Sequence, residues 1–463
     1  MPPVGRRLHA GCHRQGPAGR GRRSSTQFTF GARRRRRGDV PRQRRGRLHR
    51  VHPAGGRTRP GPGRGDLARS LCDHVVRWAI RRRQALSRWL GPGCRREGRL
   101  RLLHAKEIQE QPRAVADTLR GHLAGGQIVL DEQRVDRQDF RDVDKVFVVA
   151  CGTAYHSGLI AKHAIEHWTR VPVEVEMASE FRYRDPVLDR QTLVVAISQS
   201  GETADTLEAV RHARSQRAKV LSICNTNGAQ IPRESDAVLY THAGPEIGVA
   251  ATKTFTAQIA AVSLVGLALA QARGTKYGDE ISREYAALAG MPELMAQTLG
   301  IVEPVRELAR EIAPAKAVLF LGRGVGYPVA LEGALKLKEL AYMHAEGFPA
   351  GELKHGPIAL IEDGLPVVIV MPSPTGRHEL HRKMLSNIAE IRARGARTIV
   401  IAELGDEAAR AHATHLIEVP ATPSLFAPLV TTIPLQVLAA EIAQARGYDV
   451  DKPRNLAKSV TVE

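Results

Sequence analysis

Short runs of β-branched and apolar residues alternate with segments of helical periodicity along the body of the chain. The runs 145–152, 192–197 and 219–225 are almost entirely apolar. Residues 154–168 and 202–216 follow the first two runs and carry apolar residues at helical spacing. Strands that are apolar along their whole length are typical of a parallel sheet covered by helices on both faces. The pattern therefore predicts an α/β fold.

The same layout repeats further along the chain. The apolar runs 317–324 and 365–373 match the earlier pair, and residues 330–343 show helical spacing between them. This duplication predicts two tandem doubly wound parallel-sheet domains of the flavodoxin-like type. We place the first near residues 104–290 and the second near 291–463.

Residues 1–103 do not share this pattern. The first hundred residues hold 28 arginines, no lysine and four acidic residues, whereas the remaining 363 residues hold 40 basic and 44 acidic groups. The net charge of +20 therefore belongs to the N-terminal segment. A basic nucleic-acid arm, plain disorder and a GC-rich gene translated in the wrong frame are the three interpretations. We expect a disordered or wrong-frame segment and no nucleic-acid partner.

The remaining composition favours a cytoplasmic protein without metal or cofactor. The five cysteines show no CxxC spacing, which fits a reducing compartment. The apolar run 259–272 is too short to span a bilayer and predicts a buried helix, and no secretory signal is visible. The histidine pairs His378/His381 and His412/His415 lack acidic partners at ligand spacing, so we expect them on the surface.

A hydroxyl-rich turn, SQSGETADT, follows the apolar run 192–197. A turn between a parallel strand and a helix lies at the carboxyl edge of the sheet, where α/β proteins bind ligands. Ser198, Gln199, Ser200 and Thr203 add donors beside the free N–H groups of the helix start, and Gly201 lets the backbone come close. The set predicts a phosphate held without lysine, against the alternative of ordinary helix caps. The second copy has SPTGRHE instead, which suggests one binding site per pair of domains.

The turn and several further motifs support a resemblance to a known family. SQSGETADT and ACGTAYHSG resemble the phosphosugar-binding signature of the sugar isomerase (SIS) domain. Over about residues 104–463 the chain resembles the isomerase half of the glutamine–fructose-6-phosphate aminotransferases. The further motifs are EIGVAATKTFTAQ (246–258), LEGALKLKE (331–339), AGELKHGP (350–357) and DKPRNLAKSVTVE (451–463).

The resemblance implies an enzyme that converts fructose 6-phosphate and ammonia into glucosamine 6-phosphate, the first step of amino-sugar synthesis, and that works as a homodimer. It places the phosphate on the four polar side chains of the hydroxyl turn. Val249 and Ala251 would line the sugar, and Ala457 would offer a backbone contact. Positions 154 and 251, often Ser in the family, are Ala here, so side-chain contacts from them are absent.

Four charged or titratable residues have implied chemical roles. Glu332, Lys336 and Glu339 share one helix face, which without the resemblance would predict exposed salt bridges. The resemblance makes Glu339 the base that moves a proton between C1 and C2, with a pKa raised by burial, Lys336 a stabiliser of the open-chain sugar, and Glu332 a substrate-binding residue. His355 would open the ring, supplied by the neighbouring subunit.

Lys458, six residues from the end, is the implied Schiff-base lysine. That role requires a neutral amine in a dry site and a tail that folds back over the sugar.

The family's glutamine-hydrolysing domain is not recognisable, because the chain starts MPPVGRR without a cysteine after the initiator Met. We therefore expect no use of glutamine. Two other functions remain open: a stand-alone SIS isomerase or deaminase, and a sugar-phosphate-sensing DNA-binding regulator. The regulator is disfavoured because residues 1–100 show no helix-turn-helix periodicity.

Overall fold

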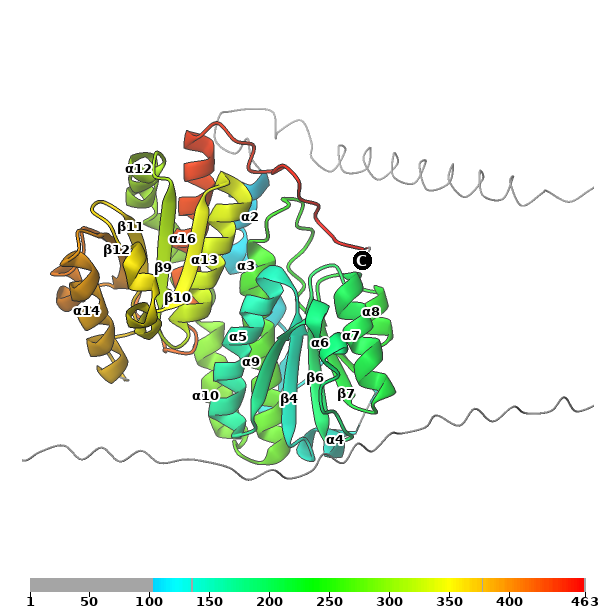
Figure 1. Ribbon diagram of the computed structural model, residues 1–463. Helices are drawn as coiled ribbons and strands as arrows, with labels where there is room; N and C mark the ends of the chain where they lie inside the picture. Colours follow the sequence, from blue (N-terminus) through cyan, green and yellow to red (C-terminus); the bar gives the residue numbers. More distant parts are fainter. Residues whose placement is uncertain (1–102, 135, 377, 462–463) are drawn as a thin grey trace, which may run out of the picture. The chain divides into compact units, whose positions relative to one another are not determined.

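The computed structural model describes residues 103–134, 136–376 and 378–461, and all of them fall within one compact unit. Residues 1–102 lie outside the described residues, so the three interpretations of the basic segment remain predictions. Two sheets organise the described part, and helices flank each of them (Figure 1). The prediction of an α/β fold with two parallel sheets is confirmed.

The first sheet has six strands in the order β3-β8-β7-β6-β4-β5. All neighbours are parallel except the short edge strand β3, which pairs antiparallel with β8. Every residue of the central strand β6 is buried, which explains its apolar sequence. The strands are β3 (Glu132–Gln133), β4 (Lys145–Ala150), β5 (Val173–Met177), β6 (Thr192–Ser198), β7 (Lys219–Cys224) and β8 (Ala237–Tyr240). The helices are α5 (Gly152–Thr169), α6 (Ala178–Arg184), α7 (Ala204–Ser215), α8 (Gln230–Arg233) and α9 (Lys253–Arg273).

The second sheet has five strands, all parallel, in the order β10-β9-β11-β12-β13. Its strands are β9 (Ala317–Gly322), β10 (His344–Pro349), β11 (Pro366–Val370), β12 (Arg397–Glu403) and β13 (His415–Val419). Its helices are α13 (Gly326–Ala341), α14 (His378–Arg392), α15 (Glu407–Arg410) and α16 (Pro428–Ala445), with two 3₁₀ turns, η2 (Ala350–His355) and η3 (Pro357–Leu360).

The remaining elements connect or flank these two copies. Helix α3 packs against α9 of the first copy, and α2 packs against α16 of the second. The N-terminal helices of the described part therefore contact both copies. These elements are α2 (Leu103–Gln109), α3 (Gln111–Leu119), β1 (Leu123–Ala124), β2 (Gln127–Ile128), α4 (Arg137–Arg141), α10 (Gly278–Ala289), α11 (Met291–Gly300) and α12 (Glu303–Ile312).

The two copies follow the same succession of elements. Strands β4 and β6 of the first copy correspond in order to β9 and β11 of the second, and helices α5, α7 and α9 correspond to α13, α14 and α16. Helices α5 and α13 contact each other. One cluster of buried side chains contains both Val148 of the first sheet and Val368 of the second, so the two copies share a continuous core.

Helix α9 contains the apolar run 259–272. By length and composition it is the one helix among the described residues that could cross a membrane, and 83% of its most apolar stretch is buried inside the protein. The same test is passed by core helices, and the packing of α9 against α5 and α3 fits that explanation. The predicted buried helix is confirmed.

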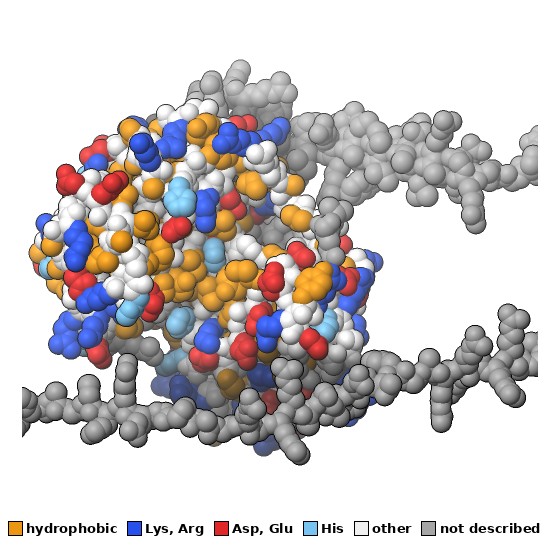
Figure 2. Space-filling view, viewed as in Figure 1, with side chains coloured by type: hydrophobic (Ala, Val, Ile, Leu, Met, Phe, Trp, Pro, Cys, Tyr) orange, Lys and Arg blue, Asp and Glu red, His pale blue; other side chains and the backbone are white. Residues whose placement is uncertain are grey.

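The histidine prediction needs one correction. His381 is buried, and its Nε2 lies 2.7 Å from Asp406 Oδ2. The acidic partner follows 25 positions later in the chain, so short-range spacing could not reveal it. On the face shown in Figure 2, basic and acidic side chains are interspersed, which agrees with the near-neutral charge of residues 101–463.

Candidate active site

The hydroxyl turn joins β6 to α7 at the carboxyl edge of the first sheet. Ser198 Oγ accepts a hydrogen bond from the N–H of Gly201 at 3.0 Å and lies 3.0 Å from Thr203 Oγ1. Ser200 Oγ accepts a hydrogen bond from the N–H of Glu202 at 3.2 Å. Thr203 is the residue before α7, yet its side chain makes no capping bond to the helix. Ordinary helix capping therefore does not account for this hydroxyl.

Gly201 is required by the shape of the turn. Its φ of +69° lies in the left-handed region, and an added Cβ would lie 2.6 Å from the Cβ of Ala229. The carbonyl of Gln199 accepts a hydrogen bond from the N–H of Asn225 at 3.1 Å. The turn is thus fixed from both sides while the Gln199 and Ser200 side chains remain partly exposed.

The C-terminal tail lies across this turn. The N–H of Ala204 donates to the carbonyl of Val460 at 3.2 Å, and Ser459 Oγ donates to Ser200 Oγ at 3.3 Å. These contacts join residues more than 250 positions apart in the chain. The tail therefore folds back over the first copy, as the implied role of Lys458 requires.

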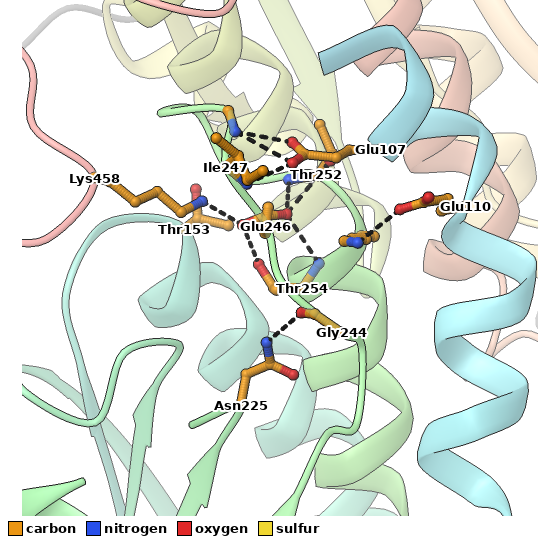
Figure 3. A network of polar contacts seen from close by, with 12 residues as sticks. Glu107, Glu110, Thr153, Asn225, Gly244, Glu246, Ile247, Thr252, Thr254 and Lys458 are labelled. Carbon is orange, nitrogen blue, oxygen red and sulfur yellow. Dashed lines mark hydrogen bonds and ion pairs between the residues drawn. The ribbon is translucent and has the colours of Figure 1, made fainter. Parts of the chain in front are cut away.

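Lys458 ends on a buried carboxylate rather than in solvent. Its Nζ lies 2.5 Å from Glu246 Oε2, and the Glu246 side chain is fully buried (Figure 3). Glu246 also accepts hydrogen bonds from the N–H of Thr252 at 2.8 Å and from Thr254 Oγ1 at 2.7 Å. Burial alone would raise the pKa of Glu246, but Lys458 and these hydrogen bonds hold it below its ordinary value. The loop between β8 and α9 thus presents a carboxylate directly to the lysine.

The charged face of α13 points into the protein. Glu332 and Lys336 are completely buried, so the interpretation of this face as exposed salt bridges is wrong for these two residues. Lys336 Nζ donates to Thr153 Oγ1 at 3.0 Å, lies 3.4 Å from Glu332 Oε1 and contacts the carboxylate of Glu339. On the other side of Glu332, His156 Nδ1 lies 2.7 Å from Oε2. Helix α5 of the first copy therefore meets α13 of the second through a polar cluster.

The charges in this cluster stabilise one another. Burial would lower the pKa of Lys336, but the carboxylates of Glu332 and Glu339 raise it above its ordinary value. Burial would raise the pKa of Glu332, but Lys336 and His156 lower it. Lys336 therefore stays an ammonium and Glu332 a carboxylate near neutral pH.

His104 is a fully buried titratable residue on which charges of both the Glu246–Lys458 pair and the Lys336 cluster act. Burial, followed by the charge of Lys336, lowers its pKa to about 4, and Glu246 and Lys458 also act on it. Neither ring nitrogen has a hydrogen-bond partner among the described residues. His104 is therefore a buried, neutral imidazole near neutral pH.

Helix α2 holds the loop that carries Glu246. The carboxylate of Glu107 accepts hydrogen bonds from the N–H groups of Ile247 and Gly248 (Figure 3). Burial raises the pKa of Glu107, and these N–H groups oppose that effect. A second anchor joins Lys253 Nζ to Glu110 Oε2 at 2.7 Å. The position of Glu246 thus depends on an element more than 100 residues earlier.

The structure brings most of the predicted residues to one edge, with one exception. Val249 and Ala251 lie half-buried on the loop after Glu246, and Ala457 is exposed beside Lys458. His355 is exposed at the end of η2 and makes no hydrogen bond or ion pair with the described residues. Within one chain, therefore, His355 does not join the cluster around Lys336 and Glu339.

Sequence reasoning missed four residues that build this site. Thr153, His156 and Glu246 lie inside motifs that carried the family resemblance, but their contacts cross from one motif to another. The available signal for Glu246 was an acidic residue followed by threonines six and eight positions later. Glu107 had no signal, because its partners are backbone groups of a distant loop.

One group among the described residues has the donor atoms of a metal site. His122, Asp131 and His242 bring their ligand atoms within 4.8 Å of one another. His122 Nδ1 lies 2.6 Å from the carbonyl of Val129, which leaves Nε2 facing Asp131. Asp131 already accepts a hydrogen bond from the N–H of Tyr240 at 2.6 Å. His242 lies on the loop between β8 and α9 that also carries Glu246, but no hydrogen bond or ion pair among the described residues joins this group to the polar cluster.

Comparison with known proteins identifies the repeated unit. The SIS domain model matches residues 139–268 and 311–445 of the chain. The chain belongs to the SIS domain family. The first match contains strands β4 to β8, and the second contains strands β9 to β13.

The chain is also similar to longer proteins that have an enzyme name. It is 76% identical over 358 residues to the glutamine–fructose-6-phosphate aminotransferase (isomerizing) of Mycobacterium bovis, covering 77% of this chain and 57% of that protein. It is 69% identical over 359 residues to the enzyme of the same name from Streptomyces coelicolor, covering 77% and 58%. The chain thus spans less than two thirds of the curated relatives it matches.

A solved structure covers the same region. The C-terminal domain of glucosamine-fructose-6-phosphate aminotransferase from Francisella tularensis is 40% identical, with a TM-score of 0.71, and the match covers 76% of this chain and 99% of that one. The described part of the SIS chain therefore corresponds to this C-terminal domain.

Proposed function

We propose that the chain converts fructose 6-phosphate and ammonia into glucosamine 6-phosphate by amination followed by ketose–aldose isomerisation. The observation that carries the proposal is the contact of Lys458 with the buried Glu246, beside the hydroxyl turn. A lysine, a carboxylate and an anion-binding turn at one edge are what imine chemistry on a phosphosugar needs. The names of the relatives from Mycobacterium bovis and Streptomyces coelicolor support the same reaction.

The phosphate would bind at the turn after β6. Ser198, Ser200 and Thr203 have hydroxyl groups there, and α7 begins directly afterwards, so that the positive end of its dipole lies at the turn. Gln199 adds an amide. Val249, Ala251 and the backbone of Ala457 would line the sugar between this turn and Lys458.

Lys458 would attack the open-chain ketone. Its amine adds to C2, water leaves, and a C2 imine forms; ammonia then displaces the lysine by transimination. The attack needs a free amine, and Glu246 is the group in contact that can take the proton. We therefore assign to Glu246 the role of proton acceptor for Lys458.

Glu339 would then move the proton. It takes one from C1 and returns one to C2, so that the C1 hydroxyl becomes the aldehyde of the amino sugar. Its partner Lys336 is a buried ammonium that would stabilise the oxygen on C1 as charge develops. Glu332 keeps Lys336 charged and in place, and contacts it at 3.4 Å.

His355 would open the sugar ring from a second subunit. It is exposed and has no partner within the described residues of its own chain, which suits a residue offered to a neighbour. We therefore propose a homodimer as the active form. We also keep the boundaries 104–290 and 291–463 for the two domains, and a reducing cytoplasmic location, which the free thiols of Cys151 and Cys224 fit.

The test is product formation from fructose 6-phosphate, with ammonium and with glutamine in parallel. We expect glucosamine 6-phosphate with ammonium. Glutamine-dependent product would show that the chain also obtains ammonia from glutamine, against our expectation. Interconversion of fructose and glucose 6-phosphates without amination would instead indicate a stand-alone isomerase. Reduction with borohydride during turnover should attach the sugar to Lys458, and a Lys458→Ala variant should remain unlabelled.

A further inference from the structure

A cavity of about 350 Å³ lies in the second copy of the fold, where β9 and β11 end. Three segments of that copy line it: the turn after β9, the turn after β11 and the segment that leads from β13 into α16. Helix α5 and Glu284 of α10 close the remaining side. The cavity is therefore a feature of the carboxyl edge of the second sheet.

These three segments correspond to the ones that build the candidate active site. In the first copy, the turn after β4 carries Thr153, the turn after β6 carries the hydroxyls, and the segment between β8 and α9 carries Glu246. Ligands bind in open α/β sheets at this edge because the strand ends leave a crevice there. The second copy has kept the crevice at the equivalent place.

The turn after β11 also keeps part of the hydroxyl geometry. Ser373 Oγ accepts a hydrogen bond from the N–H of Thr375 at 3.1 Å and lies 2.8 Å from Thr375 Oγ1. Ser198 makes the same two kinds of contact in the first copy, to Gly201 and Thr203. Residues 373–376, the start of the sequence that suggested a lost site, therefore form a second hydroxyl turn.

The charge in this cavity is different from that in the first copy. Arg323 lines the cavity, and its Nε and Nη2 donate to Asn387 Oδ1 at 3.2 and 2.8 Å. Among the described residues no carboxylate pairs with this guanidinium. Glu284, the acidic residue of the lining, is already paired with Lys276 at 3.1 Å. An unneutralised arginine with its orientation fixed by a buried amide favours an anionic ligand.

The walls favour a ligand with an apolar body, although two histidines of α5, Ser424 and Thr431 also line the cavity. Val370, Met371, Leu380, Leu425 and other apolar side chains form much of the lining. An apolar ligand body would bury its surface against these side chains, which is favourable. We propose that the second copy binds a small organic phosphate with an apolar body, the phosphate at Arg323 and the Ser373 turn and the body against these walls. The site is separate from the sugar site and does not depend on the proposed reaction.

The test is calorimetric binding of phenyl phosphate to the whole chain, with inorganic phosphate and fructose 6-phosphate as comparison ligands. Ser200→Ala weakens the first site and should leave phenyl phosphate binding unchanged. Arg323→Gln should raise the Kd for phenyl phosphate about tenfold, because a charge-assisted bond is lost. Arg394→Gln, an exposed arginine outside the lining, is the matched control.

Leu380→Glu gives a second variant, since Leu380 is half-buried and a carboxylate there would repel the anion. If circular dichroism shows that Arg323→Gln does not fold, the binding of phenyl phosphate to Leu380→Glu decides the outcome. No binding of phenyl phosphate, or binding lost in Ser200→Ala and retained in both second-copy variants, would overturn the proposal. Inorganic phosphate binding as tightly as phenyl phosphate would equally overturn it, because the apolar walls would then contribute nothing. Failure of the proposed reaction would show separately, as absent turnover of fructose 6-phosphate.

Discussion

At the scale of single residues, Glu246 has an environment that makes its charge hard to replace. It is fully buried and accepts bonds from Lys458 and from two threonines. We expect Glu246→Gln to lower kcat by roughly 10²- to 10⁴-fold, the range for loss of a general base, while fructose 6-phosphate still binds at the hydroxyl turn. Steady-state kinetics measure kcat and the binding of fructose 6-phosphate, and borohydride labelling measures the reaction of the sugar with Lys458. Glu362→Gln, an exposed carboxylate, is the control, and an unchanged kcat in Glu246→Gln would remove Glu246 from the mechanism.

His104 predicts how stability depends on pH. It is fully buried, and its pKa falls from 6.5 to about 4. Between these values the unfolded chain binds a proton that the folded chain refuses, so stability is lost as the pH falls. From about pH 7.5 to about pH 5 this residue should remove about 2 kcal/mol from the free energy of unfolding. Urea unfolding of the wild type at the two pH values should show this loss of stability. The loss should be smaller in His104→Leu and unchanged in the control His378→Gln. Equal losses in the wild type and both variants would contradict the prediction.

At the scale of elements, the tail and α2 hold each other in place. Asp451 Oδ2 accepts a hydrogen bond from the N–H of Leu103 at 3.0 Å, and Oδ1 accepts one from His104 at 2.8 Å. The tail thus caps α2, which in turn anchors the Glu246 loop through Glu107. Asp451→Ala should reduce the free energy of unfolding by about 1 kcal/mol, as loss of a helix cap does. Asp451→Asn, which keeps one acceptor, should lose less in the same unfolding measurement, and no change in either variant would show that the cap is unimportant.

The elements also show where sequence patterns succeed. Strands β4, β6, β9 and β11 could be predicted because buried parallel strands are continuous apolar runs. Edge strand β10 reads HAEGFP and is only partly buried, so no apolar run marks it. Helix α16 contains Pro434 and is buried all round, which obscures both its periodicity and its continuity.

The residues of the candidate site also differ in whether the sequence could predict them. The hydroxyl turn could be predicted because its donors lie within six consecutive residues at a strand end. The Glu246–Lys458 pair joins positions 212 apart, and Thr153 meets Lys336 across 183 positions. Contacts of this kind arise only when the tail and the two copies pack together, so no local pattern records them.

At the scale of the whole molecule, the position of His355 gives a test of the homodimer. Mixed dimers of His355→Ala and Lys458→Ala chains distinguish a histidine supplied by the partner from one supplied by the same chain. If the partner supplies it, the site of the His355→Ala chain has its own Lys458 and the other chain's intact His355. The second site of the mixed dimer has neither residue. Each mixed dimer then has one working site of two.

Random reassembly of equal amounts of the two variants should therefore restore about a quarter of wild-type activity, because half of the dimers are mixed. Each variant alone should be almost inactive. If His355 acted within its own chain, every site in the mixture would lack one residue and no activity would return. Product assays after co-refolding, with the oligomer measured by light scattering, decide between these outcomes. A mixture that forms dimers and stays inactive would show that His355 acts in its own chain.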